Sequence, residues 1–288
     1  MPVGPGDSAR VRLVHLRDPS SGVFSQRKRQ CDLWEFVWGT SILFSRLLHR
    51  LAPAFRNGGD RAAAAAAAAA NADHETDTTP AFTTALHLRR GNILEVGCGS
   101  ALCALTCAMS GARRVVATDA VEDAVRVARR SCAANSDRIP AGVMEIACAT
   151  WEKPEMFEAA AFDLVLGSDV LFGRWTAAPL SRTIARATRR DGIALIADPV
   201  RLNVEEFVRR LEEQGLSAEV RRFRKEDEHS TVEEVCELAE EREAFVKLTR
   251  AKLVVVRWKG GKDGVLLSDV ASAMLDIVLA HSEPFDEE

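Results

Sequence analysis

The sequence predicts an α/β fold: a mostly parallel sheet of seven strands, one of them antiparallel, with helices on both faces. Two observations lead to this prediction. From residue 85 onward, short apolar runs alternate with stretches of helical periodicity, a pattern typical of parallel strands joined by crossover helices. The last two apolar runs lack a crossover helix of the usual length between them, which indicates a reversed strand at the end of the sheet.

Seven short apolar runs are the predicted strands. In chain order they cover residues 92–96, 114–118, 143–148, 162–166, 193–197, 218–223 and 253–258. Helices are predicted between them, at residues 101–110, 122–134 and 179–187. Gly192 is expected in the turn after the third of these helices. Another helix is expected to begin after Asn203, a residue type suited to capping, and to end at Gly215.

The rest of the chain surrounds one predicted domain, residues 31–260. Residues 1–30 are rich in Pro, Gly, Ser and Arg without periodicity, which is typical of a flexible leader. Residues 56–80 contain nine consecutive alanines and are interpreted as a low-complexity surface insertion, since such a run has no amphipathic face. Residues 225–248 form an acidic insert, and residues 261–288 a tail in which a helix is expected at 270–279.

The composition limits which partners, cell compartment and metal content are expected for this protein. Hydrophobic residues make up 47% of the 288, which is typical of a globular protein, and the net charge of −4 gives no reason to expect a nucleic-acid partner. No apolar run reaches the length needed to span a bilayer, so no membrane partner is expected either. Seven cysteines without a CxxC pair indicate reduced thiols and a cytoplasmic protein, with the nucleus as an alternative and the mitochondrion less favoured. Cys98, Cys103 and Cys107 lie close in sequence, but a spacing of four on a helix favours core packing, and no metal is expected.

A glycine-containing turn joins the first predicted strand to the first helix. Its sequence is Glu95-Val96-Gly97-Cys98-Gly99. Glycine permits a tight turn and lets the backbone approach a ligand, while the following helix presents free N–H groups. The third glycine of a dinucleotide-binding motif is replaced by Leu102, and the acidic Glu95 suits a cationic ligand better than a pyrophosphate.

Two further residues follow this turn in the expected order. Asp119 ends the next strand, twenty residues after Gly99, where a carboxylate can accept both hydroxyls of a ribose. Trp151 follows the third strand, where an aromatic ring can lie beside an adenine. Each alone has a simpler explanation, as a tight turn or a helix cap. Together they favour an adenosyl cofactor with a cationic centre, bound through Glu95, Gly97, Gly99, Asp119 and Trp151.

At this point the chain resembles the class I, seven-β-strand, S-adenosylmethionine-dependent methyltransferases, and within them the methyltransferase-like group of protein-lysine methyltransferases. The resemblance covers residues 31–260. Three segments carry it: Val37-Trp38-Gly39-Thr40-Ser41-Ile42-Leu43, Glu95-Val96-Gly97-Cys98-Gly99-Ser100-Ala101 and Ser168-Asp169-Val170-Leu171-Phe172. It implies a Rossmann-like fold, S-adenosyl-L-methionine as cofactor, Trp38 and Ser168 as further cofactor contacts, and a protein partner that presents a lysine.

The same resemblance implies that Asp169 and Phe172 serve catalysis. A carboxylate beside the cofactor orients an amine and accepts its hydrogen bonds, and aromatic faces favour a methylated cation. Two residues depart from the family pattern. Ala101 stands where the family often has glycine, and Phe172 stands in place of a tyrosine in a chain that has none.

Two alternatives to a protein-lysine N-methyltransferase therefore remain open. The chain can act on a small molecule or on another protein atom, or it can be a cofactor-binding pseudoenzyme that works as an interaction module. The acidic stretch between residues 226 and 243 is interpreted as a solvated helix face, with docking of a basic protein segment as the alternative. The sequence predicts no particular oligomeric state.

Overall fold

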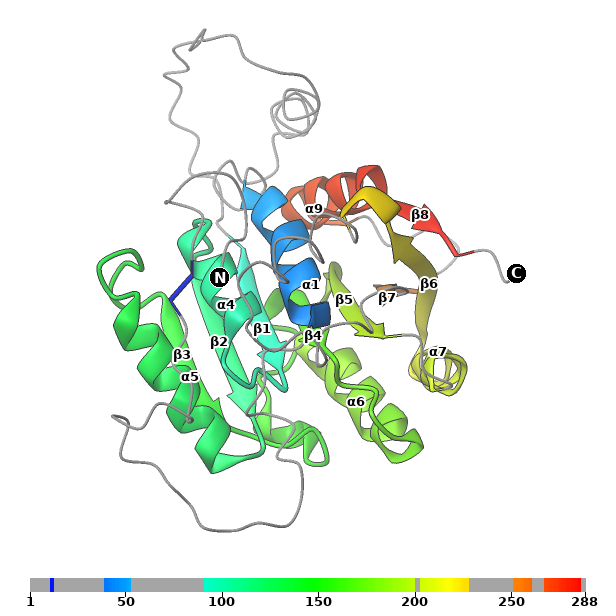
Figure 1. The fold of residues 1–288 in the computed structure, drawn as a ribbon. Coiled ribbons are helices and arrows are strands. Elements are labelled where there is room, and N and C mark those ends of the chain that lie inside the picture. The colour runs from blue at the N-terminus through cyan, green and yellow to red at the C-terminus, as the bar shows by residue number, and fades with distance from the viewer. Residues whose placement is uncertain are drawn as a thin grey trace, which may run out of the picture.

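The structure, a computed structural model, describes residues 11–12, 39–52, 91–199, 203–227, 251–260 and 267–285. The predicted Ala-rich insertion, the acidic insert after residue 227 and most of the predicted leader lie outside the described residues. What is described is a central sheet with helices packed on both of its faces (Figure 1).

The sheet has eight strands in the order β3-β2-β1-β4-β5-β7-β6-β8. Their bounds are β1 Asn92–Val96, β2 Arg114–Asp119, β3 Met144–Cys148, β4 Phe162–Ser168, β5 Thr188–Pro199, β6 Leu216–Phe223, β7 Ala251–Trp258 and β8 Ser282–Pro284. β1 to β5 are parallel to one another, whereas β7 is antiparallel to both β5 and β6. The chain direction of the crossovers reverses between β1 and β4, and ligands of such sheets bind outside the carboxyl ends of the strands at that point.

The predicted count of seven strands with one antiparallel strand is wrong by one strand. β8 pairs antiparallel with β6, so two strands, β7 and β8, run against the others. β8 has only three residues, two of them polar or charged and the third Pro284, so it carries no apolar alternation. It is a strand because Phe223 and its neighbours in β6 offer a free edge for pairing.

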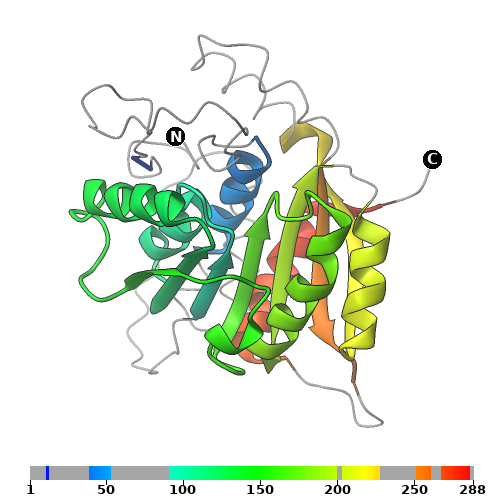
Figure 2. The same cartoon turned by 90° about the horizontal axis from the view of Figure 1, so that it is seen from below.

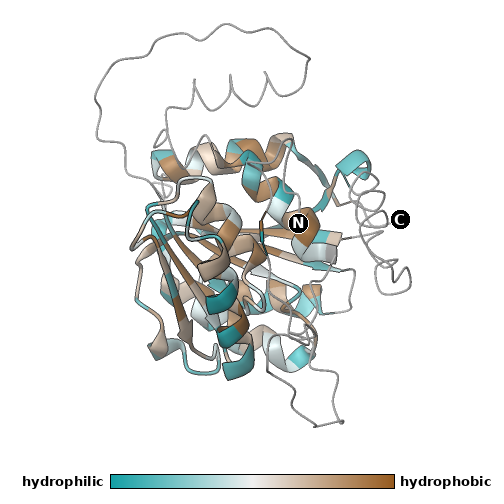
Figure 3. Ribbon diagram, turned by 60° about the vertical axis from the view of Figure 1, so that its left-hand side comes forward, coloured by the Kyte–Doolittle hydropathy of each residue, from teal (hydrophilic) through white to brown (hydrophobic). Residues whose placement is uncertain are grey.

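Helices cover both faces. The helices on one face pack on a single apolar cluster and are α1 Gly39–Arg50, α4 Leu102–Met109, α5 Glu122–Ala134 and α9 Asp269–Ala280. A second cluster lies on the opposite face, beneath α6 Arg174–Ala187 and α7 Val204–Glu213, near the short 3₁₀ helix η4 Pro154–Met156 (Figure 2). The sheet is therefore covered on both sides, and its central strands are apolar along their length (Figure 3).

The structure corrects two predictions, one for Pro179 and one for Gly192. Helix α6 begins at Arg174, five residues before the predicted start at Pro179, and Pro179 lies inside the helix. Gly192 lies within β5 rather than in a turn, because β5 begins at Thr188. A Cβ at Gly192 would lie 2.9 Å from the carbonyl oxygen of Asp163, beside an irregularity in the pairing of β4 with β5.

Two residues of the predicted leader are fixed against the end of α5. Val11 is 1% exposed. The side-chain amide of Asn135 accepts from the Arg12 N–H at 3.0 Å and donates to the Arg12 carbonyl at 2.7 Å, as in a strand ladder. These two residues of the predicted leader therefore contact the end of α5. Within the described residues, no helix is long and apolar enough to cross a bilayer.

Candidate functional site

The loop between β1 and α4 is built on left-handed backbone. The φ angles of Gly97 and Gly99 are +66° and +51°, which only glycine adopts without strain. A Cβ on Gly97 would lie 2.9 Å from Val170 and 3.0 Å from the ring of Trp151. A side chain at this position would collide with both residues, because Val170 and Trp151 pack directly against the Gly97 backbone.

Ala101 occupies the third position of this loop and adopts the left-handed conformation that suits glycine best. Its φ of +64° is left-handed, and it precedes the first residue of α4. A left-handed alanine costs about 1–2 kcal/mol. Ala101 is nevertheless fully buried and its N–H donates to the Cys98 carbonyl at 2.7 Å, so the loop closes in spite of the substitution.

Glu95 lies behind the loop. Its carboxyl group is 2% exposed and accepts from the N–H of Ala104, in the first turn of α4, at 2.9 Å. Burial raises its pKa to about 8, and the Ala104 hydrogen bond opposes that shift only in part. The Glu95 side chain ties β1 to α4 from inside the protein, and its predicted contact with the cofactor stays a prediction.

Asp119 holds the other side of the loop. Its Oδ2 accepts from Gly99 N–H at 3.0 Å and its Oδ1 accepts from Val121 N–H at 2.9 Å. Burial raises the pKa of this carboxyl group, while those backbone hydrogen bonds lower it. The carboxylate lies at the carboxyl edge of β2, and carboxylate oxygens can also accept from hydroxyl groups.

Three aromatic rings lead outward from this loop. Trp151 packs against Gly97 and lies 6.2 Å, centroid to centroid, from Phe172. Phe172 lies 6.1 Å from Trp175, which the sequence analysis missed. Exposure rises along the row, from the half-buried Trp151 to Phe172 at 41% and Trp175 at 70%. The absence of a side chain on Gly173 lets the Trp175 ring lie against the backbone.

The loop after β4 approaches the β1 loop from the neighbouring strand. Asp169 has a φ of +60°, and its N–H donates to the Ala197 carbonyl of β5 at 2.8 Å. Val170 points back at Gly97. Ser168, the last residue of β4, accepts a hydrogen bond from the hydroxyl of Ser41 at 3.1 Å. The structure thus brings Gly97, Trp151, Asp169 and Phe172 together at the carboxyl edge of β1 and β4.

Two polar side chains that the sequence analysis did not assign to the site hold this second loop. Asp198 Oδ2 accepts from Leu171 N–H at 2.8 Å, and Asn203 Nδ2 donates to the Leu171 carbonyl at 2.8 Å. Asp198 follows the fifth predicted strand directly, and that place at the carboxyl edge is the signal in the sequence that points to it.

Trp38 lies outside the described residues, so its predicted contact with the cofactor stays a prediction. The described part of its segment begins with α1. The first turn of α1 lies beside both loops: Ser41 contacts Ser168, and the Ser41 carbonyl accepts from the Cys103 thiol of α4 at 3.7 Å.

Comparison with known proteins agrees with this arrangement. A sequence model of the family described as "Lysine methyltransferase" matches residues 35–214, more than half of the chain. The chain belongs to the lysine methyltransferase family. The match includes the β1 loop, the β4 loop, Asp198 and Asn203. It makes S-adenosyl-L-methionine the cofactor and methyl transfer the reaction type of this family member.

Individual relatives are more distant. The ribosomal protein L11 methyltransferase of Geobacter metallireducens is 51% identical over 45 residues, which are 16% of this chain and only 15% of that protein. The chain resembles the solved structure of a ribosomal protein L11 methylase from Lactobacillus delbrueckii subsp. bulgaricus at 18% identity and a TM-score of 0.41, over 59% of this chain and 70% of that one. A TehB-like methyltransferase from Corynebacterium glutamicum shows 19% identity and a TM-score of 0.40, over 59% and 82%.

The donor groups of the site suit S-adenosylmethionine. S-adenosylmethionine is cationic at sulfur and has a ribose with two hydroxyl groups. Gly97 and Gly99 leave the loop after β1 without side chains at the carboxyl edge of the sheet, where β2 ends with Asp119 and Asp169 follows β4. A site for a pyrophosphate would instead favour free N–H groups and cations.

The clustered cysteines have a core role. Cys98, Cys103 and Cys107 are buried, and burial raises the pKa of each thiol. In the described part of the chain, no group of three or more His, Cys, Asp or Glu side chains is arranged to hold a metal ion.

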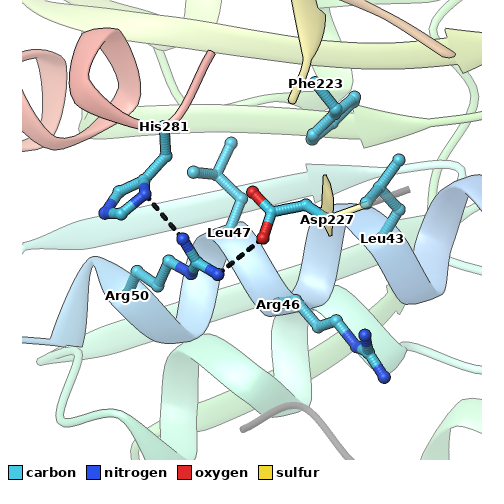
Figure 4. Close-up of a pocket in the computed structure, with 7 residues that line it drawn as sticks. All are labelled: Leu43, Arg46, Leu47, Arg50, Phe223, Asp227 and His281. Atoms are coloured by element: carbon cyan, nitrogen blue, oxygen red, sulfur yellow. Dashed lines mark hydrogen bonds and ion pairs between the residues drawn. The ribbon is translucent and has the colours of Figure 1, made fainter. Parts of the chain in front are cut away.

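A small cavity lies away from the site, between α1, the end of β6 and the end of α9 (Figure 4). Its volume is about 10 Å³, room for roughly one water molecule. Arg50 crosses it, donating to Asp227 at 2.7 Å and lying 2.6 Å from His281 Nδ1. The cavity therefore belongs to a junction that ties α1 to the far end of the sheet.

Proposed function

We propose that this chain is a protein-lysine N-methyltransferase and that Asp169 is its catalytic carboxylate. The observation that carries the proposal is the position of Asp169. It follows β4 directly, adopts left-handed backbone beside the β1 loop, and lies next to the aromatic row that begins at Trp151. Membership of the lysine methyltransferase family supports lysine as the acceptor.

In this proposal the β1 side of the site holds the cofactor. The Gly97 and Gly99 backbone would lie against it, Asp119 would accept from the ribose hydroxyls, and Trp151 would cover the adenine. Ser168 and Trp38 are proposed as further contacts, and Glu95 supports the loop from behind. When bound, S-adenosylmethionine supplies an electrophilic methyl group on a sulfonium sulfur.

The β4 side handles the acceptor. A lysine ammonium has no free electron pair, so it must lose a proton before it can act as a nucleophile. A carboxylate at the rim of the site accepts hydrogen bonds from the amine, orients its lone pair and favours its approach. Asp169 is proposed for that role. Phe172 offers an aromatic face to the methylated cation, an interaction worth roughly 0.5–2 kcal/mol.

Ala101 and Phe172 raised the alternative of an inactive pseudoenzyme. Ala101 adopts the left-handed conformation that a glycine would have there, so the substitution leaves the course of the loop unchanged. Phe172 keeps an aromatic ring beside Trp151. Both observations support activity. With a net charge of −4 and reduced cysteines, we propose a protein partner and a cytoplasmic location.

Tritiated S-adenosylmethionine and a cell lysate test the proposal. The wild-type chain is expected to label a protein band in which mass spectrometry finds methyl-lysine. Asp169→Asn is expected to reduce labelling at least 100-fold while the cofactor dissociation constant, measured by calorimetry, stays within threefold. Asp163→Asn is the matched control, because Asp163 lies at the opposite end of the same strand and accepts from Asn92 N–H.

Each other outcome supports a rival. Labelled small molecules without a labelled protein would show a different acceptor. Cofactor binding without any label would show a pseudoenzyme. Wild-type rates in Asp169→Asn would remove Asp169 from the mechanism.

A further inference from the structure

We propose that Asp198 and Asn203 are positioning residues that hold the backbone of the Asp169 loop in its working conformation. This inference rests on the proposed role of Asp169. Neither residue is suggested to touch the substrate or the cofactor. They act on Leu171, two residues after Asp169, by binding both polar groups of its peptide backbone.

The conformation of Asp169 needs such support. Its φ of +60° lies in the left-handed region, which an L-residue enters at a cost and keeps only when its surroundings impose it. Asp169 has no glycine as a neighbour on either side that could absorb the turn. The conformation must therefore be set by contacts before and after this residue.

Contacts before Asp169 come from the sheet and from α1. Ser168 is still part of β4 and pairs with Ala197 of β5. Its hydroxyl accepts from Ser41, and the N–H of Asp169 itself donates to the Ala197 carbonyl at 2.8 Å. The chain thus enters the turn from a fixed direction.

Contacts after Asp169 come from two side chains. The N–H of Leu171 donates to Asp198 Oδ2 and its carbonyl accepts from Asn203 Nδ2, both at 2.8 Å. The side chains of Val170 and Leu171 are 2% and 0% exposed, so this part of the loop is also packed. With both flanks held, the φ of Asp169 has little freedom.

Asp198 stands out in its strand. The five residues before it in β5, Ile193 to Ala197, are apolar and fully buried, and Asp198 is itself 0% exposed. Burying a carboxyl group is costly unless it gains hydrogen bonds, and charge-assisted ones are the strongest. Because Asp198 is covered completely, a substrate in solution does not reach it, and its bond to Leu171 N–H transmits its effect to the site.

Asn203 adds a second, independent tether. It lies at the start of α7, where its side chain makes no capping hydrogen bond to the helix. The side chain reaches the Leu171 carbonyl instead, across 32 residues of sequence. The start of α7 and the end of β5 therefore converge on one residue of the Asp169 loop, Leu171, and hold the peptide groups on both of its sides.

Four variants test the inference, with labelling of lysate protein by tritiated cofactor as the assay. Asp198→Ala is expected to lower the initial rate at saturating cofactor at least 10-fold. Asp198→Asn keeps an oxygen that can accept from Leu171 N–H, so it is expected to stay within threefold of wild type. Asn203→Ala is expected to lose three- to tenfold, and Asn203→Asp more, because a carboxylate cannot donate to the Leu171 carbonyl.

The cofactor dissociation constant separates positioning from general damage. It is expected to change less than twofold in all four variants, because the β1 loop and Asp119 are untouched. Asp198→Ala creates a buried gap, and the variant can fail to fold. If it does, the rate of Asn203→Ala decides the test, because Asn203 is only half-buried. Melting curves identify the folded variants.

The outcomes distinguish this inference from the proposed function. If Asp169→Asn is inactive while folded Asn203→Ala and Asp198→Ala keep wild-type rates, the positioning role is wrong and the function stands. If Asp198→Asn is as slow as Asp198→Ala, the oxygen acceptor is not what matters, and the inference is also wrong. If Asp169→Asn keeps the wild-type rate, the proposed function itself fails.

Discussion

The two loops of the candidate site, after β1 and after β4, both adopt left-handed backbone, but they do so with different residues. Both leave the carboxyl ends of adjacent parallel strands, β1 and β4, and both contain left-handed residues. The β1 loop reaches this conformation mainly with Gly97 and Gly99, which adopt it without strain, although Ala101 is left-handed as well. The β4 loop uses Asp169, a residue that adopts it only with strain.

This difference follows from the packing and the proposed role of each loop. The glycines of the β1 loop serve its left-handed conformation, and Gly97 also lets Val170 and Trp151 pack directly against the backbone. In the proposed function the β4 loop presents the Asp169 carboxylate, so glycine would not serve there and the conformation has to be imposed by contacts from other elements. Asp198 and Asn203 supply that constraint, 27 and 32 residues away from Leu171 in sequence.

The largest effect is expected from Gly97→Ala. The left-handed φ adds about 1–2 kcal/mol of strain, and crowding against Val170 and Trp151 adds about 1–3 kcal/mol. We expect a loss of about 2–5 kcal/mol of unfolding free energy and at least a 100-fold loss of cofactor affinity, measured by urea unfolding and calorimetry.

Gly142→Ala is the control for Gly97→Ala. Gly142 has a similar φ of +78° but no atom within 4 Å of a Cβ there. We expect Gly142→Ala to lose only about 1–2 kcal/mol of unfolding free energy through backbone strain, with no change in cofactor affinity. Equal losses in the two variants would mean that close approach contributes nothing at Gly97.

Glu95→Gln tests the side-chain brace of the β1 loop through pH. A carboxyl group whose pKa rises from 4.5 to about 8 on folding contributes stability that is fully present below pH 4.5 and lost as pH rises to about 8. Glutamine can accept from Ala104 N–H without ionising. The stability gain of Glu95→Gln over wild type should therefore grow between pH 5 and pH 8, by on the order of 3 kcal/mol.

Urea unfolding at the two pH values measures that gain. Glu155→Gln, on the exposed surface of η4, is the control and is expected to shift stability by less than about 0.5 kcal/mol at either pH. A pH-independent difference between Glu95→Gln and wild type would show that Glu95 does not titrate with folding.

Asp169→Gly tests whether the aspartate at this left-handed position makes the protein less stable than glycine would. Glycine relieves the left-handed strain but adds freedom to the unfolded chain, so the net expectation is a gain of up to about 1 kcal/mol. Methyl transfer should nevertheless be lost. Thermal unfolding and the labelling assay measure the two effects, and a variant that is both less stable and inactive would contradict the trade-off.

Ala101→Gly should have the smallest effect. The relief of strain is offset by the loss of one buried methyl group, worth about 0.8 kcal/mol, and by the entropy of the unfolded chain. We expect stability within about 1 kcal/mol of wild type and cofactor affinity within threefold. A tenfold rise in affinity by calorimetry would mean that Ala101 distorts the β1 loop.

Much of the fold could be predicted because its information is local. β1 and α5 have the predicted bounds, Asn92–Val96 and Glu122–Ala134, since apolar run and helical stripe each stand out in sequence. β8 could not be predicted, because three residues ending in Pro284 have no pattern of their own. The prediction for Trp38 remains open.

The candidate site likewise combines features that short segments predict with features that they do not. The glycines of the β1 loop, the place of Asp119 at the end of β2 and that of Asp169 after β4 are properties of short segments, and the sequence by itself determined them. Only the tertiary structure decided that the carboxyl group of Glu95 turns inward to α4, that Trp175 continues the aromatic row, and that Asp198 and Asn203 meet at Leu171. The physical reason is that a glycine carries its conformational freedom with it, whereas a strained aspartate depends on hydrogen bonds from strands and helices that only folding brings near.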